Sequence, residues 1–138
     1  MAVSLPEPAR KLLTDKAYGH AITFSPKGKP QLTMVWMDVD GDTVLINTAK
    51  GRLKVRNLEK DPRIMVSVQD RNDPQSYLLV EGTGTLTEQG ADAHIDKLAK
   101  RFLGMDKYPW RAPGEDRVLI KIAAERLSGF MAGMKPWK

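Results

Sequence analysis

Short runs in which apolar and polar residues alternate dominate the chain and predict strands. In the run 31–39, Leu32, Met34 and Trp36 share one face, because successive side chains of a strand point to opposite sides. Tight turns are predicted at 25–30, which holds one glycine and two prolines, and at 40–42. The same patterning predicts further strands at 20–24, 43–48, 63–69, 77–86, 117–123 and 126–131.

Helical spacing predicts three helices, over 7–14, 52–60 and 89–103. Ser4 is the expected N-cap of the first, and the second is expected to end before Pro62. Because these helices do not alternate with the strands, a doubly wound sheet is disfavoured. We predict a mainly β (α+β) fold in one domain over residues 1–138, a small antiparallel barrel of about six to seven strands with two to three peripheral helices.

The composition narrows the chemistry that the chain supports. None of its 138 residues is cysteine, which excludes disulfides, thiolate nucleophiles and cysteine-based metal sites. The two histidines lie far apart in the sequence, and no metal site is expected. His20, near the start of a strand, is interpreted as structural, and His94, beside the apolar stripe of its helix, as solvated. No nucleophile or acid–base pair stands out, so no catalytic residue is predicted.

Targeting signals are not apparent in the sequence. The first thirteen residues lack the apolar segment and the small-residue cleavage site of a secretory signal. No apolar run reaches the roughly 18 residues that a membrane span needs. We therefore expect a cytoplasmic protein without a membrane span.

The net charge of +5 is concentrated in one segment. Residues 50–63 hold six basic and two acidic side chains, a local charge of +4, and the remainder of the chain is close to neutral. Nucleic-acid binding usually involves a longer basic stripe or interleaved aromatic residues, and this segment contains no aromatic residue. The pattern favours a compact phosphorylated small molecule over nucleic acid.

The same segment runs from a predicted strand through a short loop into a helix. Such a junction exposes unpaired backbone N–H groups and the positive end of the helix dipole, which together attract anions. Asn47 and Thr48 supply side-chain hydrogen-bond groups, and Gly51 permits close approach of a ligand to the backbone. The alternative interpretation, a solvated basic face, remains equally open at this point.

These residues also carry a resemblance. The segments 29–31, 51–58 (Gly-Arg-Leu-Lys-Val-Arg-Asn-Leu), 61–63 (Asp-Pro-Arg), 80–84, 94–99, 101–104 and 117–122 occur in the order typical of the flavin- and deazaflavin-binding split β-barrel family. That family resembles pyridoxamine 5′-phosphate oxidase in fold. The resemblance covers residues 8–127, and it is closest to the branch that uses the deazaflavin coenzyme F420 in place of FMN.

The resemblance implies a set of cofactor-binding residues. Arg52 and Lys54 would contact the cofactor phosphate, with Asn47 and Gly51 beside them, and Gln31 and Thr33 would flank the heterocycle. Asn57 matches the motif as well, with bracing of the helix as its alternative role. The C-terminal tail agrees least with the family pattern. There Met134 and Trp137 are candidates for capping a substrate pocket, with a frayed terminus as the alternative.

The resemblance further implies an F420-dependent oxidoreductase that transfers hydride between the deazaflavin and an unsaturated small-molecule substrate. Since the cofactor carries the hydride, the lack of a protein nucleophile is expected. Split barrels of this type are homodimers with the cofactor at the subunit interface. An FMN-binding enzyme of the pyridoxamine 5′-phosphate oxidase type and a non-enzymatic F420-binding protein remain the alternatives. Met34, Trp36, Tyr77 and Trp110 are candidates for an apolar pocket, or for ordinary packing.

Overall fold

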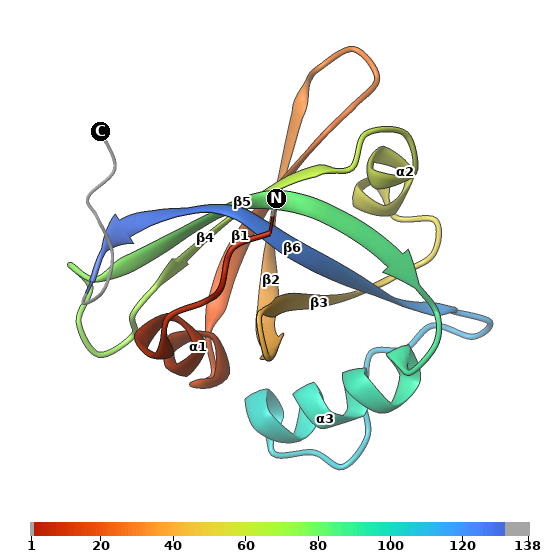
Figure 1. Cartoon of the computed structure of the whole chain (residues 1–138). Coiled ribbons are helices and arrows are strands. Elements are labelled where there is room, and N and C mark those ends of the chain that lie inside the picture. The colour runs from red at the N-terminus through yellow and green to blue at the C-terminus, as the bar shows by residue number, and fades with distance from the viewer. Residues whose placement is uncertain (1, 132–138) are drawn as a thin grey trace.

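The computed structural model describes residues 2–131, so Met134 and Trp137 lie outside the described residues. This part of the chain forms six strands and three helices, which are labelled in Figure 1. In chain order they are α1 (Glu7–Thr14), β1 (Tyr18–Phe24), β2 (Pro30–Asp40), β3 (Thr43–Ala49), α2 (Leu53–Lys60), β4 (Arg63–Gln69), β5 (Tyr77–Thr87), α3 (Ala91–Leu103) and β6 (Arg117–Phe130).

The strands form one closed antiparallel barrel in the order β1-β2-β3-β6-β5-β4. This confirms the predicted mainly β barrel with peripheral helices. In Figure 1, α1 and α3 lie below the barrel, and α2 lies beside the hairpin formed by β1 and β2. Closure brings β3 against β6, with Thr48 opposite Val118 and Ala49 opposite Arg117, so two segments far apart in the sequence share one rim.

The last strand differs from the prediction. The sequence predicts two strands, 117–123 and 126–131, whereas the structure has one continuous β6. Its pairing with β5 shifts by one residue, because Glu81 pairs with Arg126 whereas the next residue, Gly82, pairs with Ala124. Glu125 is therefore the extra residue of a β-bulge. The bulge interrupts the alternation in the sequence without ending the strand.

The barrel interior is filled by the inward-facing residues of the alternating strands. In β4, for example, Ile64, Val66 and Val68 are buried and the residues between them are exposed. Leu12 and Leu13 of α1 join this core. A second cluster lies between α3 and the barrel, where Ile95, Leu98 and Phe102 pack against Trp36 and Tyr108. Helix α3 is thereby attached to the outside of β2.

The helix boundaries agree closely with the predicted ones, but the predicted N-cap Ser4 is wrong. Pro6 occupies the cap position of α1 with extended backbone, and no side chain caps the helix. Proline is accommodated there because the first N–H groups of a helix have no partner within the helix. No helix within residues 2–131 is both long and apolar enough to cross a membrane.

Candidate functional site

A cavity of about 180 Å³ opens where β2 and β3 meet the start of α2, the side of α3 and the segment between α3 and β6. It combines cationic and hydroxyl groups with apolar and aromatic ones. Its lining consists of Met34, Val35, Trp36, Asn47, Thr48, Arg52, Lys54, Ile95, Leu98, Tyr108, Trp110 and Arg117.

Lys54 is the most unusual residue of the cavity. It lies in the first turn of α2 and is only 6% exposed. Among residues 2–131, no carboxylate or hydrogen-bond acceptor pairs with it. Burial lowers the pKa of Lys54, and the nearby charges of Arg52 and Arg117 lower it further. A buried cation without a counter-charge destabilises the fold unless an anion joins it.

Thr48 adds a second unpartnered group. Its hydroxyl oxygen is fully buried and makes no hydrogen bond to the described part of the chain. Buried polar atoms of proteins are almost always hydrogen-bonded. The Thr48 hydroxyl, the Lys54 ammonium group and two guanidinium groups surround one cavity. This set fits an anion with several oxygen acceptors, such as a phosphate.

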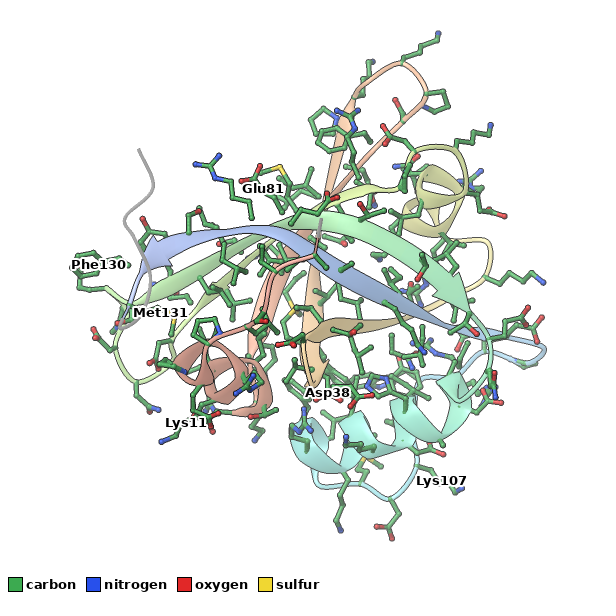
Figure 2. All side chains as sticks on the ribbon, in the orientation of Figure 1. Lys11, Asp38, Glu81, Lys107, Phe130 and Met131 are labelled. Carbon is green, nitrogen blue, oxygen red and sulfur yellow. The ribbon has the colours of Figure 1, made fainter. Side chains whose placement is uncertain are left out.

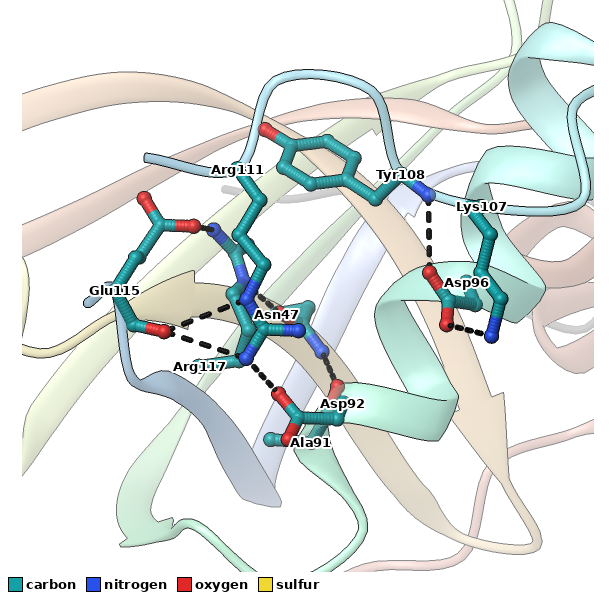
Figure 3. A network of polar contacts seen from close by, with 9 residues as sticks. All are labelled: Asn47, Ala91, Asp92, Asp96, Lys107, Tyr108, Arg111, Glu115 and Arg117. Atoms are coloured by element: carbon teal, nitrogen blue, oxygen red, sulfur yellow. Dashed lines mark hydrogen bonds and ion pairs between the residues drawn. The ribbon is translucent and has the colours of Figure 1, made fainter. Parts of the chain in front are cut away.

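Arg117 is held in a fixed orientation by its neighbours (Figure 3). Its Nε donates to Asn47 Oδ1 at 3.0 Å, and its Nη1 donates to Glu115 Oε2 at 3.0 Å. The guanidinium carbon lies 4.9 Å from the centre of the Tyr108 ring, which adds a cation–π contact. Arg52 approaches the same carboxylate, with 3.9 Å between Arg52 Nη2 and Glu115 Oε1.

Asn47 connects the cavity to a buried charge network. Its Nδ2 donates to the carbonyl oxygen of Ala91 at 2.9 Å and lies 3.1 Å from His94 Nδ1. Because Arg117 can only donate to Asn47 and the Ala91 carbonyl can only accept from it, the orientation of the amide is determined. His94 Nδ1 therefore accepts, and His94 Nε2 carries the proton that it donates to Asp38 Oδ2 at 2.9 Å.

The solvated position predicted for His94 is wrong. His94 is buried, with an exposed fraction of 9%, because it contacts Asp38 of β2. Figure 2 labels Asp38 between β2 and α3. Asp38 also accepts from Arg101 at 2.9 Å and lies 3.5 Å from Lys97 Nζ. Burial alone would raise the pKa of Asp38, but hydrogen bonds from His94, Arg101 and the Val39 backbone outweigh it and hold the pKa well below its ordinary value.

Aromatic side chains form the other wall of the cavity. Trp36 stacks on Phe102 with ring centres 4.8 Å apart and planes within 3°. Tyr108 meets Trp36 edge to face at 6.1 Å, and Trp110 lies 6.3 Å from Trp36. This wall offers flat apolar surface to a planar ring system. Of the four residues predicted to line an apolar pocket or to pack in the ordinary way, Met34, Trp36 and Trp110 line the cavity. Tyr77 lines a different groove, together with Tyr18 and His20.

The structure brings together three of the seven predicted cofactor-binding residues, Asn47, Arg52 and Lys54. Gly51 lies between Asn47 and Arg52 on the exposed loop, where its φ of 91° favours glycine. The other three, Gln31, Thr33 and Asn57, do not line the cavity.

Asn57 and Gln31 meet instead at Thr23 of β1. Asn57 Nδ2 donates to Thr23 Oγ1 at 3.1 Å, and Thr23 Oγ1 donates to Gln31 Oε1 at 3.2 Å. Since Asn57 is 2% exposed, this contact braces α2 against the barrel. Thr33 is half-buried on β2, and its hydroxyl oxygen has no partner among residues 2–131.

Sequence reasoning did not identify Arg117, Glu115 and Tyr108 as site residues. Arg117 reaches Asn47 from 70 positions away in the sequence, through the pairing of β3 with β6. The local sequence around Arg117 carries no signal for this pairing. Within residues 2–131, no three histidine, aspartate or glutamate side chains are arranged to hold a metal ion.

The closed six-stranded antiparallel barrel with three helices is a split barrel of the α+β class. Residues 5–130 match the pyridoxamine 5′-phosphate oxidase family, and the chain belongs to that family. Its members bind a flavin cofactor.

Solved structures agree with this membership. One described as an F420 reductase is 31% identical with a TM-score of 0.76, and the match covers 90% of this chain and 98% of that chain. HupZ of Group A Streptococcus shares the fold at 20% identity and a TM-score of 0.69, over 96% of this chain and 99% of that chain. General Stress Protein 26 of Bacillus anthracis does so at 20% identity and a TM-score of 0.63, over 87% and 88% of the two chains.

Proposed function

We propose that this protein is an F420-dependent reductase that transfers hydride between the deazaflavin and an unsaturated organic substrate. The observation that carries the proposal is the cavity itself, which places a buried, unpaired Lys54 and an unpaired Thr48 hydroxyl beside an aromatic wall. The 31% identity to an F420 reductase over 90% of this chain supports F420 over FMN as the cofactor.

In this assignment, the cofactor phosphate is bound by Lys54, Arg52 and Arg117, with a hydrogen bond from Thr48. Asn47 orients Arg117, and Gly51 leaves the loop backbone open to the ligand. Trp36, Tyr108 and Trp110 border the heterocycle. Gln31 and Thr33 lie on the opposite face of β2 from Trp36 and are left out of this assignment. The cofactor supplies the hydride chemistry when bound. The protein binds it, orients it and excludes water from one face.

The cavity is too small to enclose a whole cofactor of this class, because sites for ligands of that size measure about 300–1,000 Å³. Met34 and Trp110 line the cavity and are 56% and 63% exposed. Leu32, on the same face of β2 as Met34, is 61% exposed. A second copy of the chain would cover them and complete the site. We therefore include a homodimer in the proposal. Sedimentation velocity is expected to give twice the 15.4 kDa of one chain, and a monomer at micromolar concentration would contradict it.

Titration of the protein with F420 and with FMN tests the choice of cofactor. Both ligands change fluorescence on binding, so the dissociation constants follow from the same instrument under the same salt conditions. We expect F420 to bind at least about tenfold more tightly than FMN.

Turnover is then measured by the loss of reduced F420 in the presence of enones and quinones. Tight binding of FMN without measurable binding of F420 would favour the FMN-binding enzyme instead, and binding of F420 without any turnover would favour the non-enzymatic protein.

A further inference from the structure

Glu115 is the one carboxylate within residues 2–131 that forms ion pairs with the cations of the cavity. Its Oε2 accepts from Arg117 at 3.0 Å and its Oε1 lies 3.9 Å from Arg52, so one carboxylate bridges both guanidinium groups. The side chain is 11% exposed and therefore poorly screened by water. Glu115 thus occupies donor groups that an anionic ligand would otherwise use.

The other charges near the rim are paired among themselves. Lys50 pairs with Glu88 at 3.5 Å, and Arg111 pairs with Asp92 while it donates to the backbone oxygen of Glu115 (Figure 3). The anion site therefore consists of Arg52, Lys54 and Arg117 opposed by Glu115, with two positive charges remaining. The repulsion between Glu115 and a ligand grows in proportion to the ligand's charge.

We infer that Glu115 is a specificity-determining residue that disfavours doubly charged phosphomonoesters relative to singly charged phosphodiesters. The role of Glu115 rests on the proposed function, because it concerns the phosphate of the cofactor. FMN ends in a phosphomonoester, which carries close to two negative charges at neutral pH. The phosphate of F420 is esterified on both sides and carries one. The repulsion between the Glu115 carboxylate and the phosphate of FMN is therefore twice the repulsion between this carboxylate and the phosphate of F420.

The variant Glu115→Gln tests the role of this charge. Glutamine retains an acceptor for Arg117, so the substitution removes the charge and keeps the hydrogen bond. A screened charge at this range changes affinity by about threefold for each ligand charge, so F420 binding is expected to tighten about threefold and FMN binding about tenfold. The matched control Glu81→Gln removes a carboxylate that pairs with Arg126 on the barrel, and it should change neither affinity.

Two small probes separate the role of Glu115 from the identity of the cofactor. Methyl phosphate is a dianion at about pH 8 and dimethyl phosphate a monoanion, and neither carries a ring. Chemical-shift titration of both against the wild type and Glu115→Gln is expected to show the larger gain for methyl phosphate. If Glu115→Gln gives this larger gain for methyl phosphate but the protein binds neither F420 nor FMN, the proposed function is refuted and the role of Glu115 is retained. Weaker binding of both probes by Glu115→Gln, or an equal gain for both, would overturn the role of Glu115.

Discussion

Replacing Lys54 with methionine is expected to stabilise the free protein and to weaken F420 binding. Methionine matches the length of the lysine stem and needs no counter-charge, so removal of the buried cation should raise the free energy of unfolding by about 1 kcal/mol. Loss of a charge-assisted hydrogen bond to the phosphate should weaken binding by about 10- to 100-fold. Urea unfolding and F420 titration measure the two effects, and opposite signs are typical of a residue kept for function.

Lys60→Met is the matched control, because Lys60 lies on the same helix, is exposed and does not line the cavity. It should change stability and affinity little. The pH dependence gives a further check. Because the folded state lowers the pKa of Lys54, the unfolded chain retains this proton to higher pH, and stability should rise with pH in that interval. Lys54→Met should lack this rise. A variant that is less stable than the wild type and binds F420 equally well would contradict the role of Lys54.

Replacing Asp38 with asparagine is expected to cause the largest loss of stability. The substitution leaves Arg101 and Lys97 beside a neutral group and removes the charged acceptor of His94. Breaking a buried pair by removal of one partner typically costs about 3–5 kcal/mol, and the partial exposure of Arg101 and Lys97 places the expected loss near the lower value. Urea unfolding at neutral pH measures it. Asp40→Asn, an exposed aspartate on the same strand, is the control and should cost little.

The loss from Asp38→Asn should also depend on pH. Since the folded state holds the pKa of Asp38 below its ordinary value, the charged carboxylate contributes its full stability above the unfolded pKa of about 3.9. This contribution disappears as the pH falls through the folded pKa. The difference between wild type and Asp38→Asn should therefore be constant from about pH 7 to pH 5 and shrink below about pH 4. A difference that stays the same at acidic pH would show that Asp38 acts through its shape alone.

The sequence was sufficient for the architecture and for one side of the site. Alternation and turn residues are local signals, and they place β1 to β5 and all three helices close to their observed bounds. The cationic strand–loop–helix junction is also local and indicates an anion site, and the family resemblance then assigns Arg52 and Lys54 to the cofactor phosphate. The continuous strand β6 was predicted as two strands, because a bulge at Glu125 interrupts the alternation on which the prediction depends.

The rest of the site depends on contacts between distant segments. His94 was placed in solvent because its helix position alone cannot reveal that Asp38, 56 positions earlier, lies under it. Arg117 reaches the cavity only through the pairing of β3 with β6, and Glu115 takes part in the site through its bond with Arg117. Asn57 matches the motif, but its contact with Thr23 depends on the packing of α2 against β1. These residues come into contact only in the closed barrel, so the local sequence around each of them does not reveal the contacts.

The most direct measurement of the central claim is a crystal structure of the protein grown with F420. The account predicts that the cofactor phosphate lies within hydrogen-bond distance of Lys54 Nζ and Thr48 Oγ1, two groups of the cavity that make no hydrogen bond to other residues of the segment 2–131. The heterocycle should lie beside Trp36 and Tyr108. A phosphate bound elsewhere on the protein, with Lys54 and Thr48 still unpaired, would contradict the account.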